Sequence, residues 1–208
     1  MVDEHFTSAY RNARPEDLPW YHVEPDADLV ALIEQVLPAS GAHVLDLGAG
    51  PAVHSIELAA RGHQVVAIDA VAEARTMALA LAAKRGVAID YRVGDAIHET
   101  PKGPFDLVFD RGFLHTLEPL ERSTWRVAVA RALRPGGSVV VKCFDTRPPR
   151  DFGPLGLTAR DLVDALGAPE PGGLGLELLR RTRFPGLAGR DHAAWTAMAV
   201  RISPRGTA

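Results

Sequence analysis

The sequence predicts an α/β fold: a doubly wound, seven-stranded, mostly parallel sheet with an antiparallel edge strand. Three observations predict it. Short apolar runs alternate with longer helical stretches from residue 43 onwards, which is typical of βαβ units. Glycines such as Gly62 and Gly86 follow the predicted helices, at the position that ends a helix. The last two β-rich segments are joined by a link too short for a crossover, so they should pair antiparallel at one edge.

The predicted elements begin after a polar, irregular stretch over residues 1–24. Asp26 is expected to cap a helix that ends near Leu37, because apolar residues recur along one face of this segment. Thr158 begins the last helix, up to residue 166, with a capping box formed with Asp161. The other predicted helices are 52–61, 71–85 and 120–133, and the predicted strands are 43–48, 65–69, 87–95, 105–110, 138–144, 174–184 and 192–202.

Composition narrows the class of protein. The 208 residues suit a single domain, and a net charge of -3 with a pI near 6.2 gives no overall attraction to nucleic acid or an anionic membrane. Cys143 is the only cysteine, so no intrachain disulfide forms, and the histidines show no metal-ligand spacing. No leader and no apolar run of 18 residues is found, so a soluble cytoplasmic protein without a metal is expected.

The stretch "VLDLGAGPA" is a glycine-rich loop after an apolar strand, and it fits a cation better than a phosphate. Gly48 and Gly50 match the first two positions of the dinucleotide fingerprint G-x-G-x-x-G, but Val53 stands at the third. Asp46 would repel a phosphate at this place, and Pro51 lacks the N–H that would bind one. The loop therefore favours a ligand that carries a positive group.

Asp69 ends the next strand, 19 residues after Gly50, at the spacing where an acid accepts hydrogen bonds from ribose hydroxyls. An aspartate at a strand end is often only a turn former. Asp46, the two glycines and Asp69 occur together at the expected spacing, however, and this combination favours a ligand-binding site. A ribose and a positive charge without a pyrophosphate describe S-adenosylmethionine better than NAD or ATP.

These motifs resemble those of the class I S-adenosylmethionine-dependent methyltransferases, with a Rossmann-like fold. "VLDLGAGPA" resembles their first motif, with Ala52 where a third glycine is common; "VVAIDA" and "YRVGDA" resemble the next two, and "FDLVFDRGFLHTL" the fourth. The resemblance implies that Asp69 binds the ribose and Asp95 the adenine amino group, with Ala96 beside the ring. The implied cofactor-binding set is Trp20, Asp46, Gly48, Ala49, Gly50, Asp69, Ala70, Asp95, Ala96 and Asp110.

Within that family, Asp110-Arg111-Gly112 resembles the small-molecule branch that includes thiopurine S-methyltransferase and the tellurite-resistance methyltransferase. The stretch "LPWYHVEPDADLV" is similar to the N-terminal part of such enzymes, in which a tryptophan segment closes over the cofactor. Trp20 is the candidate for that role, and Tyr10 is a weaker one. Both could instead pack for stability alone. The resemblance divides the single domain into an N-terminal lid and helix (1–38), a cofactor-binding core (39–145) and a C-terminal substrate-side half (146–208).

Two residues are candidates for catalysis. His115 follows the fourth strand, and the ordinary pKa of a histidine side chain, near neutral, suits a general base. The alternative is a structural histidine bonded to a loop carbonyl. Arg111 would orient an anionic substrate through its planar fork; the alternative is a salt bridge to a neighbouring acid. Neither N-P-P-Y nor D-P-P-Y occurs, so methylation of adenine or cytosine amino groups in nucleic acid is not supported. No cysteine lies beside a proline, as methylation of cytosine C5 would require. No convincing Asp–Asp–Asn set supports a magnesium-dependent catechol enzyme.

The predicted function is methyl transfer from S-adenosylmethionine to a sulfur, nitrogen or oxygen nucleophile of a small molecule, by in-line displacement. Two alternatives stay open: a non-catalytic S-adenosylmethionine-binding module, and a methyltransferase acting on a peptide. The expected partner is a small-molecule substrate, with no nucleic acid and no membrane. The loop at residues 147–157, rich in proline, is expected to help form the substrate side.

Overall fold

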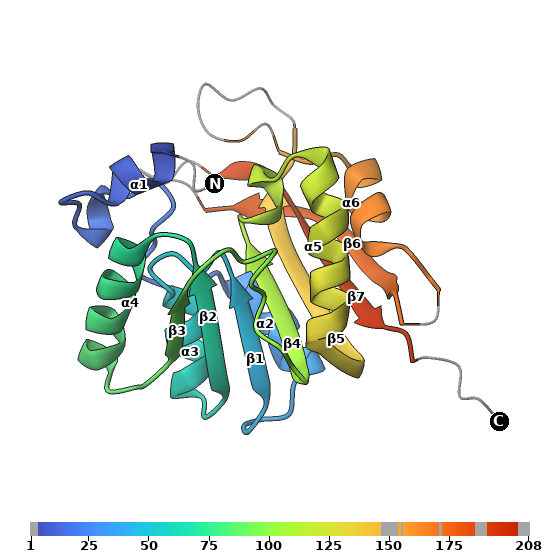
Figure 1. Cartoon of the computed structure of the whole chain (residues 1–208), viewed down its shortest axis with the longest axis horizontal. Coiled ribbons are helices and arrows are strands. Elements are labelled where there is room, and N and C mark those ends of the chain that lie inside the picture. The colour runs from blue at the N-terminus through green and yellow to red at the C-terminus, as the bar shows by residue number, and fades with distance from the viewer. Residues whose placement is uncertain (1–3, 147–153, 155, 171, 186–190, 204–208) are drawn as a thin grey trace.

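The computed structural model describes residues 4–146, 154, 156–170, 172–185 and 191–203, so most of the proline-rich loop lies outside the described residues. The chain forms a seven-stranded sheet in the order β3-β2-β1-β4-β5-β7-β6 (Figure 1). The predicted α/β class and strand number are therefore confirmed. The strands are β1 (His43–Leu47), β2 (Gln64–Asp69), β3 (Asp90–Val93), β4 (Phe105–Arg111), β5 (Leu133–Phe144), β6 (Leu174–Phe184) and β7 (His192–Arg201).

Helices cover both faces of this sheet (Figure 1). One apolar cluster joins α2 and α3 to one face of the central strands, and α4 packs on β2 and β3 beside α3. A second cluster joins α5 and α6 to the opposite face. The helices are α1 (Glu4–Tyr10), α2 (Ala27–Val36), α3 (Val53–Ala60), α4 (Ala72–Arg85), α5 (Pro119–Ala132) and α6 (Ala159–Leu166), with short 3-10 turns η1 (Pro15–Asp17) and η2 (Leu114–Thr116).

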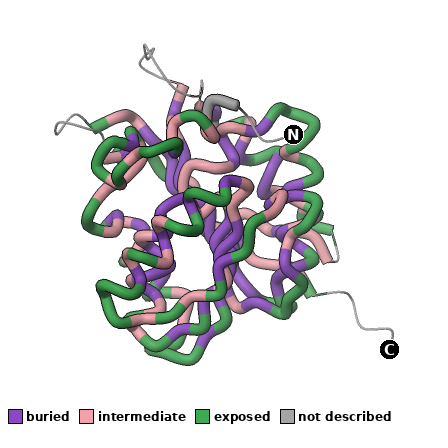
Figure 2. The backbone as a smooth tube through the Cα atoms, turned by 60° about the vertical axis from the view of Figure 1, so that its left-hand side comes forward, coloured by how far each residue is buried: buried purple, intermediate pink, exposed green. Residues whose placement is uncertain are grey.

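Parallel strands buried on both faces explain the continuous apolar runs of the sequence. In β1, Val44 contributes to the cluster on the α2 and α3 face and Leu45 to the cluster on the opposite face, and both are fully buried. Figure 2 shows the buried backbone concentrated in the middle of the molecule. In the described part of the chain, no helix is long and apolar enough to cross a membrane.

The direction of the last two strands corrects one detail of the prediction. The reversed strand is β7, which pairs antiparallel with both β5 and β6, so it lies one strand inside the sheet edge. The edge strand β6 therefore runs in the same direction as β1 to β5. The reason is burial: Ala194 to Ala197 of β7 are buried, whereas Arg180, Arg181 and Arg183 of β6 lie at the less buried edge, where charged side chains are tolerated.

Residues 4–24 are the main error of the element prediction. The sequence pattern predicts an irregular stretch, but the structure contains helix α1 and the turn η1. The aromatic side chains of this segment are drawn into the fold: Tyr10 and Leu18 pack with Val71 and Ala74 at the start of α4. Tertiary packing therefore stabilises a short helix that the sequence pattern does not indicate.

Candidate functional site

The glycine-rich loop lies between β1 and α3 and has a backbone that L side chains adopt at a cost. Gly48 and Gly50 have φ angles of +65° and +51°. A Cβ atom built on Gly48 would lie 2.6 Å from Cβ of Phe113, so no larger residue fits there. Ala52 also has a left-handed conformation, with φ +58°, at the position where the methyltransferase resemblance predicts a third glycine. The loop is therefore compact and strained in a way that lets a ligand approach its backbone closely.

Asp69 ends β2 directly beside this loop. Its Oδ2 accepts a 2.9 Å hydrogen bond from the Gly50 N–H, and its Oδ1 accepts one of 2.9 Å from the Val71 N–H. Burial raises the pKa of Asp69, and the backbone N–H donors of Val71, Gly50 and Ala70 oppose this shift. A carboxylate offers about four acceptor positions, so Asp69 retains capacity for hydroxyl donors.

Asp46 lies in β1, two residues before Gly48 of the glycine-rich loop, and only 4% of its surface is exposed. The Ser55 hydroxyl of α3 donates a 2.6 Å hydrogen bond to Asp46 Oδ2. Burial raises the pKa of Asp46 to about 8, so the protonated form dominates at neutral pH. A cationic ligand at this place would favour the ionised form.

Trp20 lies over the loop, together with Tyr10. The Trp20 indole N–H donates a 2.9 Å hydrogen bond to the Tyr10 hydroxyl, and the Tyr10 oxygen would be 2.8 Å from a Cβ built on Gly50. Phe6 of α1 packs edge-on against Trp20, with ring centroids 5.4 Å apart. The N-terminal segment therefore covers the glycine loop beyond the carboxyl end of β2 (Figure 1).

The third motif lies near the same end of the sheet. Asp95 Oδ1 accepts hydrogen bonds from the N–H groups of Ile97 and His98, and its side chain is 41% exposed. Ala96 is buried. Tyr91 of β3 connects this region to the loop, because its hydroxyl donates a 2.7 Å hydrogen bond to the Gly50 carbonyl. The roles of Asp95 and Ala96 toward adenine stay predictions.

Asp110 has a structural task in the turn after β4. It is fully buried, and its carboxylate accepts hydrogen bonds from the backbone N–H groups of Phe113 and Leu114 and from the indole N–H of Trp125. Burial raises the pKa of Asp110 to about 7, and these donors oppose the shift. The contacts support a cap for the η2 turn; a direct role at the cofactor stays a prediction.

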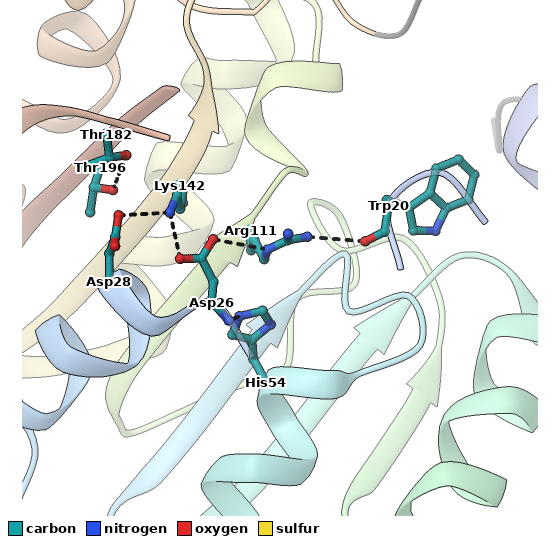
Figure 3. Close-up of polar contacts among 8 residues, drawn as sticks. All are labelled: Trp20, Asp26, Asp28, His54, Arg111, Lys142, Thr182 and Thr196. Carbon is teal, nitrogen blue, oxygen red and sulfur yellow. Dashed lines mark hydrogen bonds and ion pairs between the residues drawn. The ribbon is translucent and has the colours of Figure 1, made fainter. Parts of the chain in front are cut away.

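Arg111 is held in an ion cluster that links distant parts of the chain (Figure 3). Its Nε lies 3.8 Å from Asp26 Oδ2, and its Nη1 donates a 3.3 Å hydrogen bond to the Trp20 carbonyl. The guanidinium also lies 4.3 Å from the centre of the Phe184 ring. Burial lowers the pKa of Arg111 to about 10, so it stays cationic at neutral pH. The predicted alternative, a salt bridge to a neighbouring acid, is therefore present.

His115 is buried, and its Nδ1 accepts a 3.0 Å hydrogen bond from the Phe144 N–H. Its ring stacks on that of Phe144, with centroids 4.8 Å apart. A neutral imidazole whose Nδ1 accepts carries its proton on Nε2. In this arrangement the ring does not offer Nδ1 as a base, and the structural alternative agrees better with the contacts, although the partner is an N–H rather than a carbonyl.

Sequence reasoning missed Asp26 and Lys142 as parts of this region. Asp26 does occupy the N-cap position of α2, but its carboxylate forms no cap hydrogen bond; Oδ1 instead accepts a 2.6 Å hydrogen bond from the Lys142 ammonium. No local signal pairs residues 116 positions apart. A lysine inside the apolar run "SVVVKCF" is the one available clue, because a buried ammonium requires a partner.

Comparison with known proteins identifies the family and the fold. A family described as "Methyltransferase domain" matches residues 44–137. The 2-heptyl-1-hydroxyquinolin-4(1H)-one methyltransferase of Mycobacteroides abscessus is 33% identical over 161 residues, which cover 74% of this chain and 70% of that enzyme. Across eight curated relatives, the chain spans from 41% to 70% of their length.

Solved structures share the fold. One from work on the conversion of a disulfide bond into a thioacetal group during echinomycin biosynthesis has a TM-score of 0.82 at 26% identity, covering 97% of this chain and 94% of that one. The 1,6-didemethyltoxoflavin-N1-methyltransferase of Burkholderia thailandensis, with bound S-adenosylhomocysteine, has a TM-score of 0.70 at 20% identity, covering 96% and 87%. The identity to the quinolone enzyme over more than two thirds of both chains shows the family: the chain belongs to the class I S-adenosylmethionine-dependent methyltransferases.

Proposed function

We propose that the protein transfers the methyl group of S-adenosylmethionine to a sulfur, nitrogen or oxygen nucleophile of a small molecule. The observation that carries the proposal is the contact between Asp69 and Gly50, which places a half-buried carboxylate against the compact glycine-rich loop. Residues 46–52 contain no basic side chain that would bind a pyrophosphate. The quinolone relative, which by its name methylates a small heteroaromatic molecule, also supports the proposal.

Each part of the cofactor has a candidate among these residues. Asp69 would accept the ribose hydroxyls, Asp46 would favour the positively charged amino-acid end, and Trp20 with Tyr10 would cover the loop. When bound, S-adenosylmethionine supplies a methyl group activated by its sulfonium. The task of the chain is then to align the acceptor and to exclude water.

The acceptor side is proposed at the carboxyl ends of β4 and β5. There the rings of His115, Phe144 and Phe184 lie in contact, and Arg111 stacks on Phe184. A cation beside aromatic rings favours a planar acceptor with an ionised oxygen or sulfur. Such a nucleophile arrives without its proton, so it needs no general base.

The test is release of S-adenosylhomocysteine on incubation with S-adenosylmethionine and a panel of acceptors. The panel contains 2-heptyl-1-hydroxyquinolin-4(1H)-one, an aromatic thiol, a phenol and a primary amine. We expect turnover with at least one ionisable aromatic acceptor. Cofactor binding without turnover across the panel would contradict the proposal and favour the non-catalytic alternative.

A further inference from the structure

Lys142 of β5 is an unusual residue in this fold, because it has no exposed surface. Its ammonium donates hydrogen bonds to Asp26 Oδ1 at 2.6 Å and to Asp28 Oδ2 at 3.2 Å (Figure 3). Both acids belong to the start of α2. The cluster therefore ties the N-terminal part of the chain to the strand that ends at the proposed acceptor side.

Asp26 is the shared member of two ion pairs. Its Oδ1 binds Lys142, whereas its Oδ2 faces Arg111 and, within the described residues, accepts no hydrogen bond. Its backbone N–H donates a 2.9 Å hydrogen bond to His54 Nε2. The backbone and one carboxylate oxygen are thus both held in place while the other oxygen faces the guanidinium.

The Arg111 guanidinium is held in one orientation, but some of its N–H groups have no hydrogen-bond partner among the described residues. Its side chain is 10% exposed, and within the described residues its Nη2 and Nε have no hydrogen-bond partner. A flat guanidinium stacked on Phe184, bonded to the Trp20 carbonyl and paired with Asp26 has little freedom left. Unsatisfied buried N–H groups are costly unless a ligand binds them.

We propose that Asp26 and Lys142 are positioning residues for Arg111. Lys142 fixes the Asp26 carboxylate, and that carboxylate holds the Arg111 guanidinium in place at the carboxyl end of β4. The Trp20 carbonyl couples the same guanidinium to the segment that covers the glycine loop. The inference rests on the proposed function, because it assigns Arg111 to the acceptor side.

Geometry offers a matched control for this proposal. Asp26 and Asp28 both bind Lys142, but among the contacts of the described residues only Asp26 also faces Arg111. Asp26→Asn and Asp28→Asn each remove one negative charge from the Lys142 pair. A purely structural cluster would respond to both by a loss of stability alone. A positioning role predicts that Asp26→Asn also changes Arg111.

The first readout needs no substrate. In ¹H–¹⁵N spectra of the full chain, the Arg111 Nε–H resonance is assigned as the signal that is missing from the spectrum of Arg111→Lys. We expect Asp26→Asn and Lys142→Met to shift this resonance and Asp28→Asn to leave it in place. Asp26→Glu keeps the negative charge that Lys142 requires but moves it by one methylene. This variant should therefore also shift the Arg111 Nε–H resonance. It replaces Asp26→Asn as the test variant if Asp26→Asn does not fold.

The second readout separates acceptor handling from cofactor binding. With an acceptor that gives turnover, Asp26→Asn should lower kcat/KM for that acceptor by about tenfold or more, because misplacing a positioning group is costly. The Kd for S-adenosylmethionine should change by less than about threefold, and Asp28→Asn should stay within the same margin of wild type on both measures.

The two proposals fail in different ways. Absence of turnover by the wild type overturns the proposed function, while the spectra still judge the contact between Asp26 and Arg111. An Arg111 resonance that responds equally to Asp26→Asn and Asp28→Asn, or to neither, overturns the positioning role. The same conclusion follows if both variants lose thermal stability and retain wild-type kcat/KM.

Discussion

The carboxylate of Asp69 accepts a hydrogen bond from the backbone N–H of Gly50, which lies 19 residues earlier in the chain. This contact joins the end of β2 to the loop after β1, at neighbouring positions in the parallel sheet. It holds the loop in place through the same carboxylate that is predicted, from its spacing, to accept hydrogen bonds from ribose hydroxyls. The surroundings of this contact determine how the protein should respond to pH and to substitution.

Cofactor binding should release a proton near neutral pH. Asp46 has a pKa of about 8 and is mostly protonated at pH 7, whereas a cationic ligand favours its ionised form. Affinity for S-adenosylmethionine should therefore rise between about pH 6 and pH 7.5, by at most about tenfold per pH unit. Calorimetry in two buffers of different ionisation enthalpy measures the released proton. Asp46→Asn should remove the dependence; an equal release by that variant would assign it to another group.

Gly48→Ala should weaken cofactor binding and destabilise the fold. The new Cβ would lie 2.6 Å from Cβ of Phe113, and the alanine would have to adopt the left-handed backbone of Gly48, with φ +65°. Gly86→Ala is the matched control, because Gly86 has φ +73° with no atom within 4 Å of the new Cβ. Each should lose about 1 kcal/mol of unfolding free energy from the left-handed backbone. Only Gly48→Ala should also reduce binding in calorimetry, and unchanged binding would show that the loop tolerates a side chain.

His115→Gln tests whether His115 is a base. Loss of a general base usually lowers kcat by about 10²- to 10⁴-fold. The contacts predict a smaller effect, below about tenfold, because Nδ1 is occupied by the Phe144 N–H and the ring stacks on Phe144. The variant should instead lower Tm, because glutamine does not stack. If turnover falls by about two orders of magnitude or more while Tm is unchanged, His115 acts as the base after all.

Stability should fall in mild acid because of His54. Burial lowers its pKa well below the usual value, and the nearby Arg111 and Lys142 add to this effect. A group with a lowered folded pKa of this kind contributes its full stability above the unfolded pKa of about 6.5 and loses it as pH falls toward the folded pKa, by at most about 1.4 kcal/mol per pH unit.

Urea unfolding at about pH 7.5, 6.5 and 5.5 measures this loss on both sides of the unfolded pKa. His54→Gln should flatten the dependence, since glutamine does not titrate and still offers an acceptor to the Asp26 N–H. The control His98→Gln changes an exposed histidine, whose side chain is 65% exposed, and should retain the wild-type slope. A slope that His54→Gln leaves intact would place the acid-sensitive group elsewhere.

Local patterns were sufficient to predict most of the sheet and the glycine loop. Strand periodicity, helix-ending glycines and the spacing of Asp69 are short-range signals, and each has its expected place in the structure. The capping box at Thr158 is also confirmed, with the Asp161 N–H donating to the Thr158 hydroxyl. These features depend on residues close in sequence or on the alternation of whole elements.

Long-range pairing explains what was not predicted. The placement of β7 inside the edge depends on which strand buries more surface, and the charges of Arg180, Arg181 and Arg183 were the clue to an exposed edge. The pairing of Lys142 with Asp26 joins two elements that become neighbours only in the folded chain. Helix α1 gains its stability from contacts with α4 rather than from its own seven residues.

The central claim is that the Gly50 and Asp69 arrangement binds S-adenosylmethionine, and calorimetric titration of the full chain tests it most directly. Wild type should bind, and Asp69→Asn should bind at least about tenfold more weakly, because a charged hydrogen bond contributes about 1.5–3 kcal/mol. Asp90→Asn, which changes an exposed acid of β3, should bind as wild type does. No binding by the wild type, or equal binding by Asp69→Asn in a folded state, would contradict the account.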